Sequence, residues 1–472
     1  QGEGGIHPTR WDYLQGLRKL CDQQNWLLML DEVQCGIGRT GKWFAHQWAG
    51  IQPDVMPLAK GLGSGVPIGA VVVGPKAKNV LGPGNHGTTF GGNPLAMRAG
   101  VETLRIMQED NLLANATRIG DHLRAALERR DMKAEELAKT PVTVTLAGGG
   151  LCSFVMLDGG KSAFDRQSVL RKAMAPLMEE QPLELVLGLF GSAEARRENA
   201  REALYVAWLN GARLPTRRKK PAPRPLARIH LYGARDAAGF AEIAAVAEAN
   251  TLARTLTALP SNELTPSDYR QRLRQIALGR KWQFEEFDMR RLRRLGAGAF
   301  VAVAQGSAPE DAAIVHLSCR PKKPQGRLAL VGKGICFDTG GHNLKPAKYM
   351  AGMHEDMSGS AVALGLMQAL IERNMPLAID AWLPIAQNHL SPEAYKQNDI
   401  VTALDGTTIE VVHTDAEGRM VLADTLALAT RGVGNGSGKG NARPDLVIDF
   451  ATLTGSMGYA LGSRYSGVFA TS

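Results

Sequence analysis

Hydrophobic and polar positions alternate along this chain with the periods of short strands and amphipathic helices. Residues 1–130 contain two apolar runs that predict strands, 26–30 and 68–73, and one stretch that predicts a single long helix, 93–130. Residues 131–215 predict two further strands, 151–157 and 185–190, and two helices, 165–180 and 193–211. The pattern therefore predicts an α/β protein from its first residues onward.

After residue 229, predicted strands and helices alternate over a longer stretch of the chain. Strands are predicted at 328–331, 378–384, 409–412 and 446–450, and helices at 357–373 and 420–431. Strands that alternate with helices in this way favour a mostly parallel, mixed sheet with helices on both faces. Ligands of such sheets gather at the carboxyl ends of the strands, so functional residues are expected there.

Three domains are predicted from these changes of pattern, with boundaries at 1–130, 131–228 and 229–472. The middle segment is a small α/β domain that ends in a basic, proline-rich linker, 213–228. No aromatic residues are interleaved with the basic residues of this linker, which favours a solvated connection over a nucleic-acid contact.

Composition and charge narrow the class of protein. Of the 472 residues, 44% are hydrophobic and 21% are charged, which is typical of globular domains and not of disordered chains. The net charge of +9 is spread along the chain and does not by itself predict a nucleic-acid partner. The five cysteines form no Cys-x-x-Cys pair, which indicates reduced thiols. No apolar stretch could span a bilayer and no secretion signal is visible, so a cytoplasmic protein without a membrane partner is expected. The chain begins with Gln, and its true N-terminus is expected upstream.

Acidic and basic residues cluster in three runs at the ends of neighbouring predicted elements. The first cluster is 331–341, with Lys333 and Asp338, and the second is 343–346 followed by 353–359, with Lys345 and Asp356. The third is 414–419, with Asp415 and Glu417. Each run alone fits an ordinary glycine-rich turn or an acidic helix start. Together they bring four carboxylates to one crevice, where mutual repulsion favours binding of two divalent cations.

These motifs resemble the leucyl aminopeptidase (cytosol aminopeptidase) family of dinuclear metallopeptidases. The resemblance rests on the runs VGKG, FDTGG, LKP, EDMSGSA, TDAEGR and ATLTG, which occur in this order. It implies hydrolysis of N-terminal, leucine-like residues from peptides by a hydroxide that two metals activate. It also implies peptide substrates with a free N-terminus and a homo-oligomer, a hexamer in the family, although the catalytic domain is expected to be C-terminally truncated at Ser472.

The resemblance also implies a role for each residue. The metal ligands would be Lys333, Asp338, Asp356, Asp415 and Glu417, with Lys333 binding as a neutral amine and Asp338 and Glu417 bridging the metals. Lys345 would polarise the scissile carbonyl, and Arg419 would hold a bicarbonate that acts as general base. Manganese or zinc, and also magnesium, suit oxygen ligands with one amine.

The first segment shows different chemistry. An acidic residue, Asp31, follows an apolar run, Lys60 lies in a glycine-rich turn, and Thr89 lies in a run of small residues, 87–94. A buried aspartate that protonates a pyridine nitrogen, with a lysine that forms a Schiff base, suits pyridoxal phosphate. The segment resembles class III pyridoxal-phosphate aminotransferases of the acetylornithine type. In that family Asp31 would pair with the ring nitrogen, Gln34 would approach the ring hydroxyl, Lys60 would form the Schiff base, and Thr89 would reach the phosphate bound to a partner subunit.

The residues expected to cradle most of the cofactor phosphate do not occur among these 472. Residues 1–130 are therefore interpreted as an incomplete fragment of a pyridoxal-phosphate-transferase-type α/β domain, and tight binding of pyridoxal phosphate is not expected. Three functions remain open at this point: a metal-dependent aminopeptidase, an acetylornithine- or ornithine-type aminotransferase, and an inactive fusion of the two fragments.

Overall fold

The computed structural model describes residues 9–471 except 81, 83, 147, 218–223, 308–309, 432–442 and 463–464. The chain divides into two compact units, Gln1–Met156 and Leu157–Ser472, which are described separately. The boundary predicted near residue 130 falls inside the first unit, and the one near 228 falls at the start of a strand of the second unit. The division into three functional domains stays a prediction.

The first unit consists of helices and two short strand pairs. Its elements are α1 (Trp11–Gln23), η1 (Ala45–Trp48), β1 (Val55–Leu58), η2 (Lys60–Gly63), β2 (Ala70–Val73), α2 (Pro94–Glu109), α3 (Leu112–Glu128), η3 (Ala134–Ala138), β3 (Val142–Thr145) and β4 (Leu151–Phe154). Strands β1 and β2 pair antiparallel, as do β3 and β4. Two small clusters of buried side chains, one around Met56 and Leu58 and one around Ala126 and Val142, form its core.

Two predictions for this unit are wrong. The single helix over 93–130 is two helices, because Asn111 adopts a left-handed conformation (φ 51°) between α2 and α3. Asparagine tolerates that conformation better than most residues, so the apolar period continues while the backbone changes direction. The strand predicted at 26–30 is only one isolated bridge, from Met29 to Val55.

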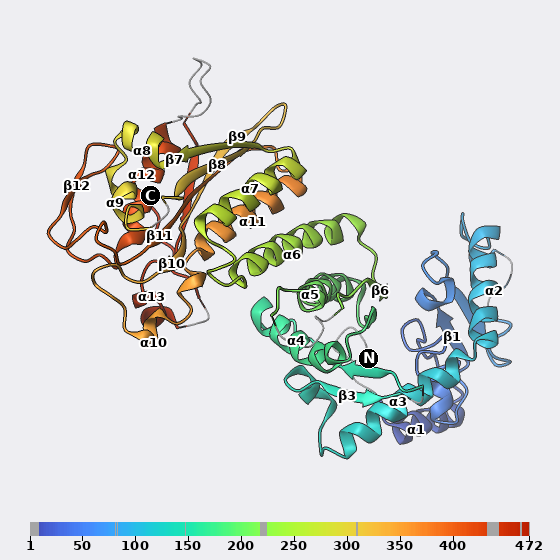
Figure 1. The fold of residues 1–472 in the computed structure, drawn as a ribbon. Coiled ribbons are helices and arrows are strands. Elements are labelled where there is room, and N and C mark those ends of the chain that lie inside the picture. The colour runs from blue at the N-terminus through green and yellow to red at the C-terminus, as the bar shows by residue number, and fades with distance from the viewer. Residues whose placement is uncertain are drawn as a thin grey trace. The chain divides into compact units, whose positions relative to one another are not determined.

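A mixed six-stranded sheet forms the centre of the second unit (Figure 1). Its strands are β7 (Gln283–Asp288), β8 (Ala313–Cys319), β9 (Gly326–Gly332), β10 (Gly334–Asp338), β11 (Leu377–Asn388) and β14 (Leu446–Phe450). The order is β14-β9-β11-β8-β7, and β10 also pairs with β11. Strands β14, β9, β10 and β11 are parallel, whereas β8 runs antiparallel to both β11 and β7. The predicted mixed, mostly parallel sheet is confirmed.

Helices cover both faces of this sheet, as predicted (Figure 1). One face carries α6 (Ala237–Thr257), α7 (Pro266–Arg280) and α11 (Ser358–Glu372), and the other carries α8 (Met289–Leu295), α9 (Gly298–Ala304) and α12 (Glu417–Arg431). Successive side chains of β9 point to opposite faces of the sheet and contribute to the hydrophobic core on each face. Leu328 and Leu330 pack on the first face, and Ala329 and Val331 pack on the second. A strand buried on both faces reads as a continuous apolar run, which is what the sequence shows.

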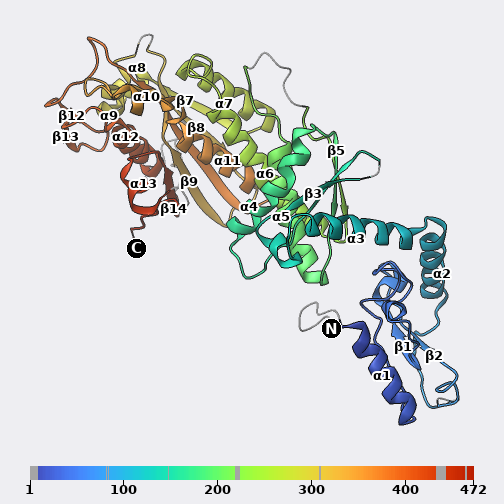
Figure 2. The ribbon, with the colours of Figure 1, turned by 90° about the horizontal axis from the view of Figure 1, so that it is seen from below.

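The remaining elements surround this core. They are α4 (Ala163–Glu179), β5 (Glu184–Gly188), α5 (Ala193–Gly211), β6 (Arg228–Tyr232), α10 (Ala347–Met350), η4 (Met353–Glu355), β12 (Ile400–Thr402), β13 (Thr408–Glu410) and α13 (Ser456–Leu461). The strand predicted at 409–412 is not in the central sheet, since β13 pairs only with β12 in a ribbon beside α9 (Figure 2). Among the described helices, none has the length and apolar character required to cross a membrane.

Candidate active site

Four parallel strands end at one edge of the sheet, and polar residues follow each of them. Lys333 lies between β9 and β10, Asp338 ends β10, Asn388 ends β11, and Thr452 follows β14. The beginnings of two helices reach the same edge: Asp356 precedes α11, and Glu417 opens α12. The residues that the sequence predicted at strand ends therefore come together, as expected for a sheet of this class.

Lys333 is the centre of the first half of the cluster. Its Nζ lies 2.8 Å from Oδ1 of Asp356 and 2.7 Å from Oε1 of Glu417, and it also donates to the carbonyl oxygen of Thr452 at 3.1 Å. The hydroxyl of Thr452 donates to Oδ1 of Asp356 at 2.5 Å. The three charged side chains are almost fully buried. Buried charges are stable only when paired, and this lysine pairs with two carboxylates at once.

Two glycines allow the Lys333 side chain to reach this position. A Cβ at Gly418, in the first turn of α12, would lie 2.9 Å from Cε of Lys333, so any larger residue would displace the lysine stem. A Cβ at Gly359, in the first turn of α11, would clash with the carbonyl oxygen of Phe450 and lie 3.0 Å from the Lys333 backbone nitrogen, so this glycine allows α11 to approach the backbone of β14 and of Lys333. The glycines of the EDMSGSA and TDAEGR runs therefore serve close packing of two helix starts against one lysine.

Lys345 is the centre of the second half. Its Nζ lies 2.9 Å from Oδ2 of Asp338 and also pairs with Oδ1 of Asp415. Carboxylate oxygens of Asp338, Asp415 and Glu417 all lie within 4.8 Å of one another, which makes this trio a group that could hold a metal ion. The two lysines thus flank one continuous group of carboxylates.

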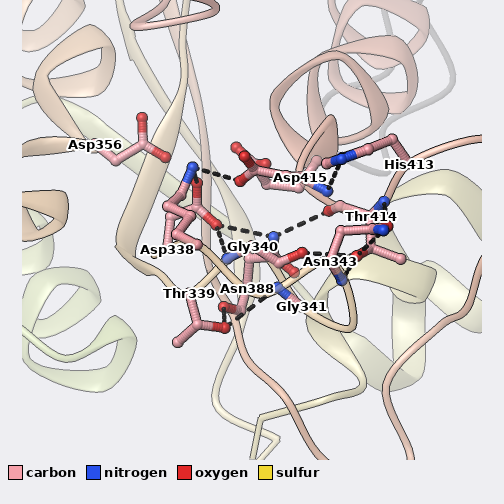
Figure 3. A network of polar contacts seen from close by, with 12 residues as sticks. Asp338, Thr339, Gly340, Gly341, Asn343, Asp356, Asn388, His413, Thr414 and Asp415 are labelled. Atoms are coloured by element: carbon pink, nitrogen blue, oxygen red, sulfur yellow. Dashed lines mark hydrogen bonds and ion pairs between the residues drawn. The ribbon is translucent and has the colours of Figure 1, made fainter. Parts of the chain in front are cut away.

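A second layer of hydrogen bonds fixes these carboxylates (Figure 3). Oδ1 of Asp338 accepts from the backbone N–H of Gly340 at 2.8 Å and from Nδ2 of Asn388 at 2.9 Å. The same Asn388 nitrogen donates to the carbonyl of Thr414, beside Asp415, at 3.1 Å. Thr414 in turn exchanges hydrogen bonds with Asn343, 2.8 Å in each direction. Asp338 and the loop that carries Asp415 are therefore held by one shared amide.

Asn343, Thr414 and Thr452 lie in the motif runs of the sequence, but no role was predicted for them, and Asn388 lies outside these runs. Asn388 is fully buried and ends β11 soon after the apolar run 381–386, so its place at a strand end was a usable signal. The other three lie in loops, and the partners in their contacts are far apart along the chain, 71 residues for Thr414 and Asn343 and 96 for Thr452 and Asp356, so no local pattern predicts these contacts.

Burial and repulsion set the protonation of the cluster. The pKa of Asp356 is raised to about 7, because burial and repulsion from Glu417 outweigh the opposing effect of Lys333. Burial lowers the pKa of Lys333, but Glu417 and Asp356 outweigh this effect and the net pKa is raised. The pKa of Lys345 is also raised, because Asp415 and Asp338 together outweigh burial. A lysine that ligates a metal needs the opposite shift, which adjacent divalent cations would supply.

The donor set fits divalent cations. Among the described residues, the cations paired with the four carboxylates of Asp338, Asp356, Asp415 and Glu417 are the ammonium groups of Lys333 and Lys345, so negative charge remains in excess. Oδ2 of Asp356 is buried and has no hydrogen-bond partner among the described residues. A buried carboxylate oxygen without a partner costs free energy that a cation would recover. The cluster is therefore a candidate acidic metal site.

Arg419 does not join these ion pairs. It lies in the first turn of α12 with an exposed side chain, two residues after Glu417. The histidines near the site contact the backbone: Nδ1 of His413 accepts from the N–H of Asp415 at 3.2 Å, and Nδ1 of His342 lies 3.0 Å from the carbonyl of Tyr395. His413 thus contacts the backbone of the loop that carries the Asp415 carboxylate.

The residues predicted to bind pyridoxal phosphate lie in the first unit. Met29 bridges in parallel to Val55, and the N–H of Glu32 donates to the carbonyl of Pro57 at 3.2 Å. Asp31 and Lys60 therefore follow neighbouring parallel segments, which brings them to the same end of these segments. Gln34, Thr89, Asp31 and Lys60 all have exposed side chains.

The prediction of a buried aspartate in this unit is wrong. The buried acid is the next residue, Glu32, which is 2% exposed. Its carboxylate accepts from the backbone N–H groups of Ala45 and His46 at 3.0 and 2.9 Å and lies 3.0 Å from Nδ1 of His46. Because neighbouring side chains of an extended segment point in opposite directions, burial of Glu32 leaves Asp31 exposed.

Comparisons with known proteins match the chain in two parts. Residues 251–472 match the model of the cytosol aminopeptidase family, catalytic domain, and residues 1–162 match that of class-III aminotransferases. An acetylornithine aminotransferase of Bordetella pertussis is 55% identical over 158 residues, 34% of this chain and 39% of the relative. A probable cytosol aminopeptidase of Leifsonia xyli is 40% identical over 252 residues, 53% of this chain and 49% of the relative.

One solved structure extends the likeness to the fold. A bottromycin maturation enzyme, BotP, in complex with Mn superimposes with a TM-score of 0.62 at 33% identity and covers 72% of each chain. The chain spans about half the length of the aminopeptidase relative and less than half that of the aminotransferase relative.

We predict that Asp338 is required to bind metal. In the parent chain, about two divalent ions per chain are expected after incubation with Mn²⁺ or Zn²⁺ and gel filtration. Asp338→Ala removes a carboxylate from the centre of the trio and should lose both ions, measured by elemental analysis. Glu410→Ala, an exposed acid of β13, is the matched control and should retain both. An unchanged metal content in Asp338→Ala, with an unchanged melting curve, would contradict the assignment.

Proposed function

Because residues 251–472 belong to the cytosol aminopeptidase family and residues 1–162 to the class-III aminotransferases, we propose that the segment 229–472 is a metal-dependent aminopeptidase domain. It would remove leucine-like N-terminal residues from peptides. The observation that carries the proposal is the convergence of Lys333, Lys345 and four carboxylates at one sheet edge, from motifs up to 84 residues apart along the chain. Substrates are peptides with a free α-amino group.

The proposed ligands are Lys333, Asp338, Asp356, Asp415 and Glu417, with Asp338 and Glu417 shared between two ions. Manganese or zinc, and also magnesium, suit this donor set. Bound there, two divalent ions would supply a hydroxide nucleophile at neutral pH and a Lewis acid for the scissile carbonyl. The hydrogen bonds from Asn388 and Gly340 hold the Asp338 carboxylate in one orientation, which a shared ligand requires.

Lys345 and Arg419 are proposed to act on the substrate. The carboxylates around Lys345 keep its pKa raised, so it remains an ammonium that can donate a hydrogen bond to the oxygen of the scissile carbonyl as negative charge develops. Arg419 is exposed beside Glu417, where its guanidinium is free to hold a small anion such as bicarbonate. Bicarbonate would accept the proton of the attacking water as general base.

The test of the function uses two chromogenic substrates that differ in one group. The whole chain, loaded with Mn²⁺ or Zn²⁺, should hydrolyse leucine p-nitroanilide, and EDTA should abolish the release of p-nitroaniline. N-acetyl-leucine p-nitroanilide lacks the free amine and should not be hydrolysed. If leucine p-nitroanilide is cleaved no faster by the metal-loaded parent than by Asp338→Ala, the aminopeptidase proposal is wrong for this chain and the inactive fusion is favoured.

Substitution of Lys345 should reduce catalysis without reducing metal binding. Lys345→Ala removes the proposed donor to the oxyanion while the five ligands remain, so kcat should fall by roughly 10²–10³-fold at unchanged metal content. Lys348→Ala, an exposed lysine three residues away, is the control and should leave kcat unchanged. Near-parental turnover in Lys345→Ala would remove this residue from the mechanism.

The second candidate function is an acetylornithine- or ornithine-type aminotransferase. It is favoured by the class-III match and by the placement of Asp31 and Lys60 at the ends of neighbouring parallel segments. In that function Asp31 would pair with the pyridine nitrogen, Gln34 would approach the ring hydroxyl, Thr89 would contact phosphate, and Lys60 would form the covalent bond. All four side chains are exposed, whereas a cofactor held through a phosphate needs an enclosed set of donors.

We therefore predict that pyridoxal phosphate is not retained by this chain. After incubation with the cofactor and exhaustive dialysis, the parent and Lys60→Ala should show the same weak absorbance in the aldimine band, because surface lysines react equally. A yellow parent with one cofactor per chain and a colourless Lys60→Ala would reverse the prediction and favour the aminotransferase.

A further inference from the structure

Four helices of the second unit line a cavity of about 560 Å³ that is open to solvent on one side. Its walls come from the end of α5, the middle of α6, the end of α7 and the second half of α11. In both views α6 lies between α5 and the pair α7–α11 (Figures 1 and 2). This volume is within the range of sites for small organic molecules and too small for a helix or a folded partner.

The cavity exists because α6 presents small side chains to its neighbours. Ala244, Ala247 and Thr251 line the cavity from one face of α6, and none fills the space between this helix and α5. At Gly365 the backbones of α6 and α11 lie very close, since a Cβ there would be 2.9 Å from the carbonyl oxygen of Ala249. The close approach at that point, together with small residues on α6, leaves a space bounded by α7 and α11.

A buried amide in this cavity lacks a partner. Gln368, on α11, lines the cavity and is 2% exposed. Its Oε1 is buried and accepts no hydrogen bond from any described residue. A buried carbonyl without a donor is destabilising, and such groups are rare in folded proteins. Gln368 lies ten residues after Ser358, about 15 Å along α11 from the candidate metal site, so the proposed catalysis does not use it.

The charges around the cavity favour a cation. Glu248, on α6, lines the cavity with an exposed side chain, and no ion pair joins it to another described residue. Arg280, on α7, also lines the cavity, but its Nη1 pairs with Oε1 of Glu372 at 2.5 Å. The arginine charge is thus already compensated, whereas the Glu248 carboxylate is not. Both groups without partners, Glu248 and Oε1 of Gln368, are hydrogen-bond acceptors.

The remaining wall is apolar. Trp208 from α5, Leu252 from α6 and Ile276 from α7 line the cavity and are half-buried. A ligand that fits this wall needs an apolar body, and a ligand that satisfies the two acceptors needs N–H donors and a positive charge. A primary amine on an aromatic or aliphatic group combines these features.

We propose that this cavity binds a small amphipathic primary amine, whose ammonium group donates to Gln368 and faces Glu248 while its apolar part packs against Trp208, Leu252 and Ile276. The site is separate from the metal cluster and does not depend on the proposed peptidase activity. Both acceptors and the side chains of Leu252 and Ile276 belong to helices on one face of the central sheet, whereas Trp208 belongs to α5, so the ligand would join α5 to α7 and α11.

The experiment compares three probes of nearly equal size on the whole chain: 2-phenylethylamine, 3-phenylpropanol and 3-phenylpropionate. Binding is measured by isothermal titration calorimetry at pH 7, where the amine is a cation and the acid is an anion. The amine should saturate at one molecule per chain, with the alcohol weaker and the carboxylate at least about tenfold weaker than the amine. Equal affinity for the amine and the carboxylate would overturn the proposal.

Three variants assign the binding to these residues. Gln368→Met keeps the length of the side chain but removes the acceptor, and should weaken the amine by about tenfold. Gln271→Met, on the exposed side of α7, is its control and should leave the affinity unchanged. Glu248→Gln should reduce the preference for the amine over the alcohol, because the unpaired charge is lost.

If Gln368→Met does not fold, Glu248→Gln still tests the proposal. Glu248 is exposed, so its substitution is not expected to affect folding, and an unchanged preference for the amine in Glu248→Gln would then overturn the proposal. A parental affinity in Gln368→Met with a parental melting curve would do the same. Hydrolysis of leucine p-nitroanilide is not a readout here, so failure of the peptidase proposal leaves this test intact.

Discussion

The repulsion among four buried or half-buried carboxylates is the constraint on which the second unit depends. Asp338, Asp356, Asp415 and Glu417 cannot share one crevice as anions unless positive charge lies between them. Lys333 and Lys345 provide part of that charge, and divalent ions are suited to provide the rest. The glycines beside Lys333, the amide of Asn388 and the buried apolar strands all serve to hold these charges at fixed places at the edge of the sheet.

The site was more predictable from the sequence than the fold around it. Lys333, Asp338 and Glu417 lie in short runs rich in glycine and charged residues, where a strand ends or a helix begins. The local pattern and the resemblance to a known family therefore pointed to the same residues. The supporting residues were missed because their relation to the ligands is purely three-dimensional. Asn388 reaches Asp338 across 50 residues, and Thr452 reaches Asp356 across 96, and no window of sequence contains either pair.

The errors in the fold have equally specific causes. The apolar period passes through Asn111 without interruption, and a single left-handed residue divides the helix although the pattern does not change. At 409–412 an apolar run was read as a core strand, but β13 pairs only with β12 in an exposed ribbon, since strand patterning does not specify the partner strand. The buried acid of the first unit is Glu32 and not Asp31. Because side chains alternate along an extended segment, this shift of one residue places the acid on the opposite face of the segment.

The carbonyl oxygen of Thr452 that accepts from Lys333 follows β14, which among the described strands pairs with β9 at one edge of the sheet. Lys333 and Thr452 are 119 residues apart, so this contact forms only after the chain through β14 has been made and docked. Contacts of such long sequence separation are slow to form because the entropy of closing the loop is lost before they stabilise anything. The cluster is therefore incomplete until β14 has docked on β9, and an opening of β14 alone would expose Lys333 while the other described strands of the sheet stay paired.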